Sequence, residues 1–240
     1  MLSQDGIHTC GASLVDENWL VSAAHCVVNE RGRTSAKSVT AIIGTKDLRR
    51  VDKRAMYSVK SLTVPSTFAP ARTGNLKGDI ALLYLDRPVK NIKPVELANK
   101  NTDIQPWLVV AGWGLTETNR NTSPTLQYAA VPYLTVSQVK QLSQMTGSYF
   151  AMEDDKMAAG LGESDSCQGD SGGPLVVPSR REFTHSSSDE TILVGVVSYG
   201  MSARCQSGRN SVGFYTRIDP YYTWIRSEIR STGRARRSRI

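Results

Sequence analysis

One serine of this chain lies in a run of small, turn-forming residues that could make it a nucleophile. The run covers residues 165–174, reads Asp-Ser-Cys-Gln-Gly-Asp-Ser-Gly-Gly-Pro, and has Ser171 near its centre. A serine hydroxyl attacks a carbonyl carbon only if a base removes its proton and nearby donors stabilise the resulting oxyanion. Glycines beside the serine let the backbone bend so that N–H groups converge on one point. The N–H groups of Gly169 and Ser171 are therefore the candidates for an oxyanion hole.

His25 is the candidate base. The sequence contains three histidines, and His25 stands at the end of an apolar run at 19–24 that predicts a buried strand, whereas His8 and His185 have polar neighbours. Asp79 directly precedes another apolar run, and a carboxylate there is costly to bury unless it is hydrogen-bonded. A bond from a ring N–H of His25 would satisfy that carboxylate. The same bond would select the tautomer that a general base needs.

The segments around these three residues resemble the signatures of the chymotrypsin/trypsin family of serine proteases. They read Ser-Ala-Ala-His-Cys at His25, Gly-Asp-Ile-Ala-Leu-Leu at Asp79 and Gly-Asp-Ser-Gly-Gly-Pro at Ser171. Chain order matters, because other hydrolases reach the same geometry with other orders. The resemblance covers nearly the whole chain. It implies a serine endopeptidase in which His25 takes the proton of Ser171 and Asp79 orients His25, with no cofactor. No pair of Cys or His residues has ligand spacing except the adjacent His25 and Cys26, so we expect no metal.

The resemblance implies an all-β fold of two antiparallel six-stranded-type β-barrels, with the active site between them. The 240 residues suit this fold, because short apolar runs alternate with Gly- and Pro-containing turns. We expect the first barrel at about 1–100 and the second at about 101–231. Asp219 as cap and Pro220 as first residue predict a C-terminal helix, and residues 137–145 predict a shorter one.

The four cysteines are Cys10, Cys26, Cys167 and Cys205, and they allow three pairings, among which the sequence alone does not choose. The family resemblance implies Cys10–Cys26 and Cys167–Cys205. The alternative is four reduced, buried thiols in a cytosolic protein. Disulfides persist in oxidising compartments, so we expect a secreted, extracellular protein.

Charge at the substrate pocket predicts specificity. In trypsin-like relatives an aspartate six residues before the nucleophile forms the pocket floor, and Asp165 holds that place here. A buried carboxylate facing a dry pocket prefers a substrate Arg or Lys, although Asp165 could instead be a solvated loop residue. The resemblance implies that the walls comprise Ser198, Tyr199, Gly200 and Gly213, the two glycines leaving room for a long side chain. The expected partners are peptide or protein substrates with Arg or Lys at the cleaved bond, and protein protease inhibitors.

The start of the chain departs from the family pattern. In the family, the ammonium of a new N-terminus, usually Ile-Val-Gly-Gly, pairs with the aspartate before the nucleophile, which is Asp170 here. The printed sequence begins Met-Leu-Ser-Gln and contains no Ile-Val-Gly-Gly. An unpaired buried carboxylate is expensive, so we expect either an incomplete part of a secreted protease or a weak, zymogen-like enzyme. The rival hypothesis is a non-catalytic homologue that acts as a binding or inhibitor protein.

The remaining features concern the surface. The net charge is +7, and four arginines between 234 and 239 make residues 232–240 a basic tail that we expect to be disordered. We read the tail as a solvated extension and expect no nucleic-acid partner. No apolar stretch is long enough to span a membrane. Asn121 begins an Asn-Thr-Ser glycosylation sequon, and a monomer is the family default.

Overall fold

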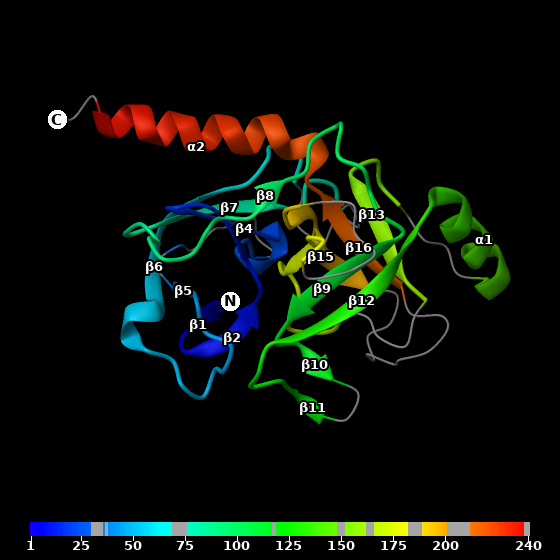
Figure 1. Ribbon diagram of the computed structural model, residues 1–240, viewed down its shortest axis with the longest axis horizontal. Coiled ribbons are helices and arrows are strands. Elements are labelled where there is room, and N and C mark those ends of the chain that lie inside the picture. Colours follow the sequence, from blue (N-terminus) through cyan, green and yellow to red (C-terminus); the bar gives the residue numbers. More distant parts are fainter. Residues whose placement is uncertain are drawn as a thin grey trace.

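The computed structural model describes residues 1–29, 36, 38–68, 76–116, 119–147, 152–161, 166–181, 189–200 and 212–237. Within these residues, β-strands dominate and form two sheets that each curl into a barrel. Figure 1 shows the two barrels beside each other, with the first in blue and cyan and the second in green to orange. The prediction of an all-β, two-barrel fold is confirmed.

The first barrel is built from strands of the N-terminal part of the chain. Its sheet has the order β2-β1-β5-β6-β7-β4-β3. β2 and β3 are separated only by Gly11 and Ala12, so one bent segment pairs with β1 at one end and with β4 at the other, which closes the barrel. The strands are β1 (Leu2–Gln4), β2 (Ile7–Cys10), β3 (Ser13–Asp16), β4 (Trp19–Ser22), β5 (Val39–Ile42), β6 (Met56–Thr63) and β7 (Ala81–Leu85).

The second barrel has the order β14-β9-β12-β13-β16-β15-β8, and pairing of β14 with β15 closes it. The strands are β8 (Glu96–Leu97), β9 (Trp107–Gly112), β12 (Gln127–Leu134), β13 (Lys156–Gly160), β14 (Pro174–Val177), β15 (Ile192–Gly200) and β16 (Val212–Arg217). A hairpin of β10 (Leu115–Thr116) and β11 (Asn119–Thr122), which contains Asn121, extends from it. β8 pairs with β15 in parallel, so the second sheet begins slightly before the expected boundary at residue 100.

A continuous hydrophobic core joins the two barrels. Its fully buried members include Leu83 of β7 in the first barrel and Leu108 of β9 and Leu193 of β15 in the second. Strands β4 and β7 are buried along almost their whole length, which matches their unbroken apolar sequence rather than an alternating pattern. The residues that follow β4, and those that precede β7, are therefore attached to strands that burial holds in place.

Helices lie at the surface. α1 (Val136–Thr146) begins with a capping box in which the side chains of Thr135 and Gln138 each accept from the other's backbone N–H. It corresponds to the short helix predicted at 137–145. Short 3-10 segments are η1 (Ala24–Cys26), η2 (Lys53–Ala55) and η4 (Asp219–Tyr221), and α2 (Tyr222–Arg237) follows η4. No helix of the described residues combines the length and the apolar character needed to cross a bilayer.

The C-terminal helix differs from the sequence expectation in two respects. Asp219 is not the cap, since Ile218 has that place and the Asp219 carboxylate instead pairs with the Arg217 guanidinium at 2.6 Å. α2 also continues to Arg237 along the upper edge of the molecule in Figure 1, so residues 232–237 are helical where we expected disorder. Alanine and arginine are good helix formers and this stretch has no proline, so the helix has no local reason to stop at residue 231.

A disulfide links Cys10, at the end of β2, to Cys26 in η1, with 16 residues of separation. This is the pairing that the family resemblance implied. It ties the strand that enters the bend at Gly11 to the turn that carries His25. Cys167 is also disulfide-bonded, and its expected partner, Cys205, lies outside the described residues.

Removing the Cys10–Cys26 bridge should destabilise the fold. We expect the Cys10→Ala/Cys26→Ala double variant to lose about 3 kcal/mol of unfolding free energy, because the bridge restricts the unfolded chain over a loop of this length. Urea unfolding followed by circular dichroism measures the loss. A variant as stable as the parent, within about 0.5 kcal/mol, would contradict this estimate.

Candidate active site

His25 and Asp79 meet although 54 residues separate them in the sequence. His25 lies in η1, directly after β4, and Asp79 lies two residues before β7, which pairs with β4. The ring Nδ1 of His25 is 2.8 Å from Asp79 Oδ2, and the His25 backbone N–H donates to Oδ1 at 2.9 Å. A proton on Nδ1 is required to bond the carboxylate, so the neutral ring keeps a free lone pair on Nε2. That is the form a general base needs.

The Asp79 carboxylate is completely buried. The hydroxyl of Ser198 donates to its Oδ2 at 2.5 Å, and Thr216 donates to the Asp79 carbonyl at 2.8 Å. Burial alone would raise the pKa of Asp79, but the bonds and charge of His25, together with Ser198, outweigh it and hold the pKa below the usual 3.8. The carboxylate is therefore ionised at neutral pH. Ser198, expected as a pocket residue, has this second contact, which the sequence did not predict.

Ser171 lies in a tight turn that packs between the barrels. Its carbonyl accepts from Gly11 N–H at 2.7 Å, and Gly172 N–H donates to the Val197 carbonyl at 2.8 Å. Gly172 has φ +77°, and a Cβ there would lie 2.7 Å from the Gly11 carbonyl and would also meet the Ser22 hydroxyl. Only glycine fits such a conformation and such an approach. The glycines of the signature thus let the nucleophile turn reach the first barrel.

Ser171 and His25 line one hollow of about 510 Å³ in the protein surface. The hollow is also bordered by polar residues of the first barrel, among them Gln4 and Thr9. His25 keeps 29% of its side-chain exposure, so its ring is accessible from this hollow. The structure therefore brings the predicted nucleophile and base to one accessible place, with the predicted acid behind the base.

The predicted oxyanion donors lie in the same turn. Gly169 has φ +95°, and the Asp170 N–H donates to the Cys167 carbonyl at 2.9 Å, which curves the backbone there. Within the part of the chain that the structure describes, neither Gly169 nor Ser171 donates its N–H to a protein acceptor. No acceptor among the described residues therefore competes with an incoming oxygen for these two N–H groups.

Asp170 turns its carboxylate inward, toward backbone donors. Its Oδ1 accepts from Gly114 N–H at 2.8 Å and its Oδ2 from Cys167 N–H at 2.9 Å. A Cβ on Gly114 would lie 2.5 Å from the Asp170 carboxyl carbon, so glycine is needed at this approach. The carboxylate is thus held by the main chain on two sides.

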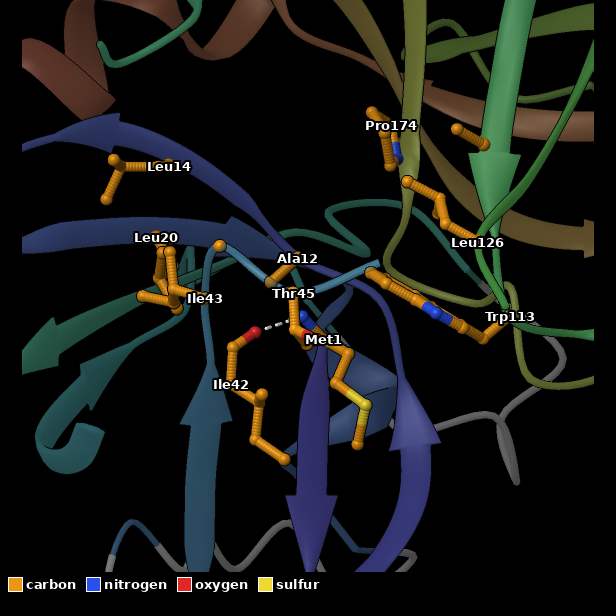
Figure 2. Close-up of a pocket in the computed structure, with 12 residues that line it drawn as sticks. Met1, Ala12, Leu14, Leu20, Ile42, Ile43, Thr45, Trp113, Leu126 and Pro174 are labelled. Atoms are coloured by element: carbon orange, nitrogen blue, oxygen red, sulfur yellow. Dashed lines mark hydrogen bonds between the residues drawn. The ribbon is translucent and has the colours of Figure 1, made fainter. Parts of the chain in front are cut away.

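The ammonium of Met1 donates to the Ile42 carbonyl at 2.9 Å instead, and burial lowers its pKa to about 5. Figure 2 shows Met1 beside an apolar cavity of about 210 Å³ where residues of both barrels meet, including Trp113 and Pro174 of the second barrel. This lining offers hydrophobic contact and little polar chemistry, so it is not the candidate active site.

The expected specificity residues are only partly described. Tyr199 stacks on Phe214 with ring centres 4.7 Å apart, and Gly200 pairs with Gly213 across β15 and β16. Among the described residues, a Cβ on Gly200 would meet only the Val212 carbonyl, at 3.9 Å. Asp165 lies outside the described residues.

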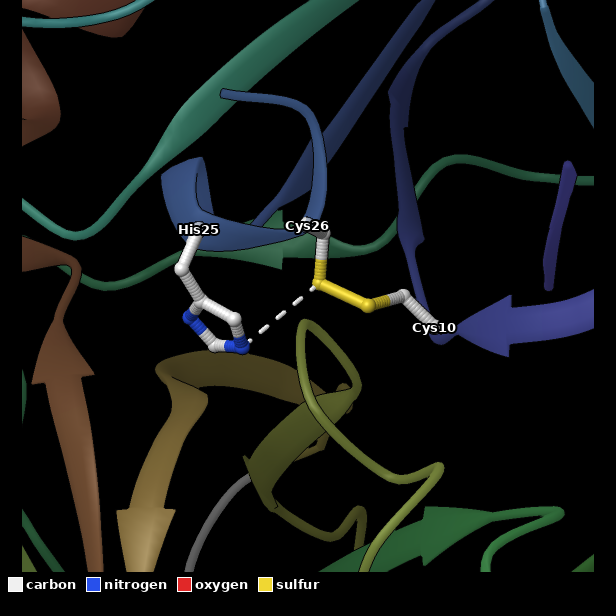
Figure 3. A group of neighbouring side chains, drawn as sticks. All are labelled: Cys10, His25 and Cys26. Carbon is white, nitrogen blue, oxygen red and sulfur yellow. Dashed lines mark hydrogen bonds between the residues drawn. A yellow bond between two sulfur atoms is a disulfide. The ribbon is translucent and has the colours of Figure 1, made fainter. Parts of the chain in front are cut away.

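Cys10, His25 and Cys26 bring one nitrogen and two sulfurs within 4.8 Å of one another, a grouping that could suggest a metal site. Figure 3 shows that the two sulfurs are joined to each other, with His25 Nε2 3.9 Å from Cys26 Sγ. A metal needs cysteine thiolates, and the disulfide leaves none here. This group therefore supports the position of His25 rather than a cation.

His8 is a residue whose place the sequence did not reveal. Its ring Nε2 lies 3.0 Å from the carbonyl of Gly169, in the turn of the nucleophile, and its Nδ1 is buried with no partner among the described residues. Polar neighbours in the sequence gave no sign of this contact, because the two residues are 161 positions apart. A carbonyl accepts only from a protonated nitrogen, so Nε2 carries the proton and Nδ1 does not.

Comparison with known proteins agrees with this geometry. The family model named Trypsin matches residues 1–225. Transmembrane protease serine 11G of Rattus norvegicus is 30% identical over 234 residues, covering 95% of this chain and 51% of the relative, and the Mus musculus protein of that name is 31% identical with the same coverage. Limulus clotting factor C of Carcinoscorpius rotundicauda is 32% identical over 237 residues, which is 92% of this chain and 22% of the relative. The chain spans about half, or less, of the length of these curated relatives.

The partly buried ring of His8 should make folding stability depend on pH. Burial lowers the pKa of His8 below 6.5, against the opposing hydrogen bond to the Gly169 carbonyl. Below pH 6.5 the unfolded chain then binds more protons than the folded one. The stabilising contribution of neutral His8 to folding is therefore complete above pH 6.5 and is lost as pH falls toward the folded pKa. His8→Gln, whose amide can still donate to Gly169, should lose less stability over this range. Thermal midpoints measured from about pH 7.5 to 5 test this, and parallel curves for the two proteins would contradict it.

Proposed function

The chain belongs to the trypsin family of serine proteases, and on this basis we propose that it is a secreted serine endopeptidase that cleaves peptide bonds after Arg or Lys. The observation that carries the proposal is the contact of a fully buried Asp79 carboxylate with His25 Nδ1 at 2.8 Å, beside a hollow that His25 shares with Ser171. An ionised carboxylate behind a histidine, with a serine in front, is an arrangement suited to acyl transfer.

In the proposed mechanism, the Ser171 hydroxyl oxygen attacks the carbonyl carbon of the substrate peptide while His25 Nε2 takes the hydroxyl proton. The resulting imidazolium is stabilised by Asp79, whose pKa is held low enough to keep it charged. The N–H groups of Gly169 and Ser171 stabilise the oxyanion. His25 then protonates the departing amine, which leaves an acyl-enzyme. In the second half, His25 takes a proton from water as the water attacks the acyl carbon, and it returns a proton to the Ser171 oxygen as the acid product leaves.

Arg or Lys specificity is proposed from Asp165 and from the small residue Gly200, which no described side chain crowds. The carboxylate would lie at the floor of a pocket whose wall includes the Ser198–Gly200 end of β15. Ser166, the next residue after Asp165, accepts a bond from the buried Tyr215 hydroxyl at 3.3 Å. This contact supports a fixed backbone next to Asp165, the residue proposed to bind the substrate cation. The sequence did not predict the contact.

Secretion is proposed from the Cys10–Cys26 disulfide, which persists in an oxidising compartment. The family implies protein substrates, and we propose that protein protease inhibitors bind at the same hollow. Asp170 is proposed as the partner of an activating ammonium, because its carboxylate already lies against the Gly112–Gly114 backbone in the turn behind the oxyanion donors.

Replacing Ser171 tests the nucleophile. We expect the chain, once it carries the activating amino terminus that Asp170 is proposed to bind, to hydrolyse a peptide amide substrate containing Arg and to react with a fluorophosphonate probe, and Ser171→Ala in the same form to lower kcat by about 10⁶-fold. Ser231→Ala, which changes an exposed serine on α2, is the matched control and should behave as the parent. Equal labelling of Ser171→Ala would refute the assignment. A folded parent that neither reacts nor cleaves would favour the non-catalytic, inhibitor-like homologue.

Replacing Asp165 tests specificity separately from catalysis. Asp165→Ser should lower the ratio of kcat/KM for Arg substrates over uncharged substrates by roughly 30-fold or more, which corresponds to the loss of at least about 2 kcal/mol from an unpaired buried charge. Asp154→Ser alters another carboxylate, whose side chain is 98% exposed, and should leave the ratio unchanged. An unaltered ratio in Asp165→Ser would remove this residue from the pocket.

A further inference from the structure

A buried ion pair in the second barrel has no part in the mechanism described above. Lys156, the first residue of β13, has no exposed side-chain surface, Asp155 has 4% exposed, and Lys156 Nζ lies 3.0 Å from Asp155 Oδ1. Removing two charges from water costs free energy, and a well-packed apolar pair in their place is often as stable or more stable. A buried ion pair is therefore weak evidence that its role is stability alone. The reason for a buried ion pair at this place must therefore lie in the contacts that the pair makes.

The contacts of the pair converge on one turn of the chain. Asp155 Oδ2 accepts from Gly78 N–H at 2.7 Å, and Lys156 Nζ donates to the Leu76 carbonyl at 2.7 Å. Residues 76–78 lead directly into Asp79, whereas the ion pair lies in the second barrel. The hydroxyl of Tyr221 also donates to Asp155 Oδ2, at 2.6 Å, and holds the carboxylate from the side of η4.

The turn before Asp79 needs external support. Gly78 has φ +74°, and a Cβ there would lie 2.9 Å from the Phe68 backbone nitrogen, so the turn is restricted to glycine. Glycine also gives the backbone the largest conformational freedom. The short bond from Ile80 N–H to the Gly78 carbonyl, at 2.7 Å, closes the turn from within. The hydrogen bonds from Asp155 and Lys156 restrict that freedom.

We propose that Asp155 and Lys156 are positioning residues for Asp79. The proposal rests on the function proposed above. Their bonds hold the backbone before Asp79, Thr216 holds the Asp79 carbonyl from β16, and the carboxylate between these two supports is directed at His25. The second barrel thereby sets the orientation of an acid that belongs to the first barrel. Catalytic groups must keep their geometry to within about 0.5 Å, which accounts for a costly charged support at this place.

Two double variants separate positioning from charge and packing. Asp155→Asn/Lys156→Met and Asp155→Leu/Lys156→Met both remove the two charges and both lose the bond to Leu76. They differ in the side chain at 155, because the asparagine amide oxygen can still accept from Gly78 N–H whereas leucine cannot. Both avoid the single buried charge that either single substitution would leave behind.

The kinetic expectation is a difference in kcat between these two variants. The Asn/Met variant should keep kcat within a few-fold of the parent on a small Arg amide substrate. The Leu/Met variant should lose about 10- to 100-fold in kcat with little change in KM, because a displacement of roughly 1 Å can cost 10²-fold. Equal kcat values for the two folded variants would overturn the proposal.

A second measurement does not depend on activity. The Nδ1 proton of His25, assigned by its loss in His25→Gln, should exchange slowly with solvent in the parent and in Asn/Met but faster in Leu/Met. If the parent proved inactive while this difference held, the proposed function would fail and the positioning role would stand. If exchange were the same in all three proteins, the positioning role would fail whatever the activity.

A milder variant covers the case in which Leu/Met does not fold. Tyr221→Phe removes one of the donors to Asp155 and leaves the ion pair and its bond to Gly78 in place. It should lower kcat by a few-fold and speed His25 Nδ1 exchange, with KM unchanged. A Tyr221→Phe protein identical to the parent in both measurements would overturn the proposal in that case.

Discussion

The structure around the hollow depends on one buried negative charge. Asp79 has no exposed surface, and a carboxylate in that state must be surrounded by donors or it would take up a proton. Its donors come from η1 through His25, from β15 through Ser198, and the support of its backbone comes from β16 and β13. Satisfying this single group therefore brings strands of both barrels to one point. The orientation of His25 follows, because its ring is one of those donors.

Glycine makes the second meeting of the barrels possible. The nucleophile turn approaches the bend between β2 and β3 so closely that a Cβ on Gly11 would lie 2.5 Å from Gly173 Cα. Backbone atoms make the contact there, and the bond from Gly11 N–H to the Ser171 carbonyl fixes its register. The apolar core supplies the attraction between the barrels without direction. The hydrogen bonds and the close glycine contacts determine how the barrels meet, and with that the distance between base and nucleophile.

Contacts made by His8, Ser198 and the Asp155–Lys156 pair were beyond sequence reasoning for a common reason. Each joins residues far apart in the chain: 161 positions for His8 and Gly169, 119 for Ser198 and Asp79, and 77 for Asp155 and Gly78. Adjacent Asp and Lys are ordinary surface residues by composition, whereas in the fold both are buried and contact the turn before Asp79. The helical end of the chain was mispredicted for a local reason. The high charge after residue 231 predicted disorder, although the residues there form a helix.

The sequence by itself determined the parts whose physics is local. Apolar runs identified β4 and β7, the glycine-rich run identified the nucleophile turn, and the resemblance of three motifs named His25, Asp79 and Ser171. Periodicity and backbone freedom act over a few residues, so they can be recognised in the linear chain. The tertiary structure alone decided which donors reach Asp79, where the ion pair lies and which N–H groups stay open. Burial, and hydrogen bonding between groups far apart in the chain, depend on how folding brings those groups together.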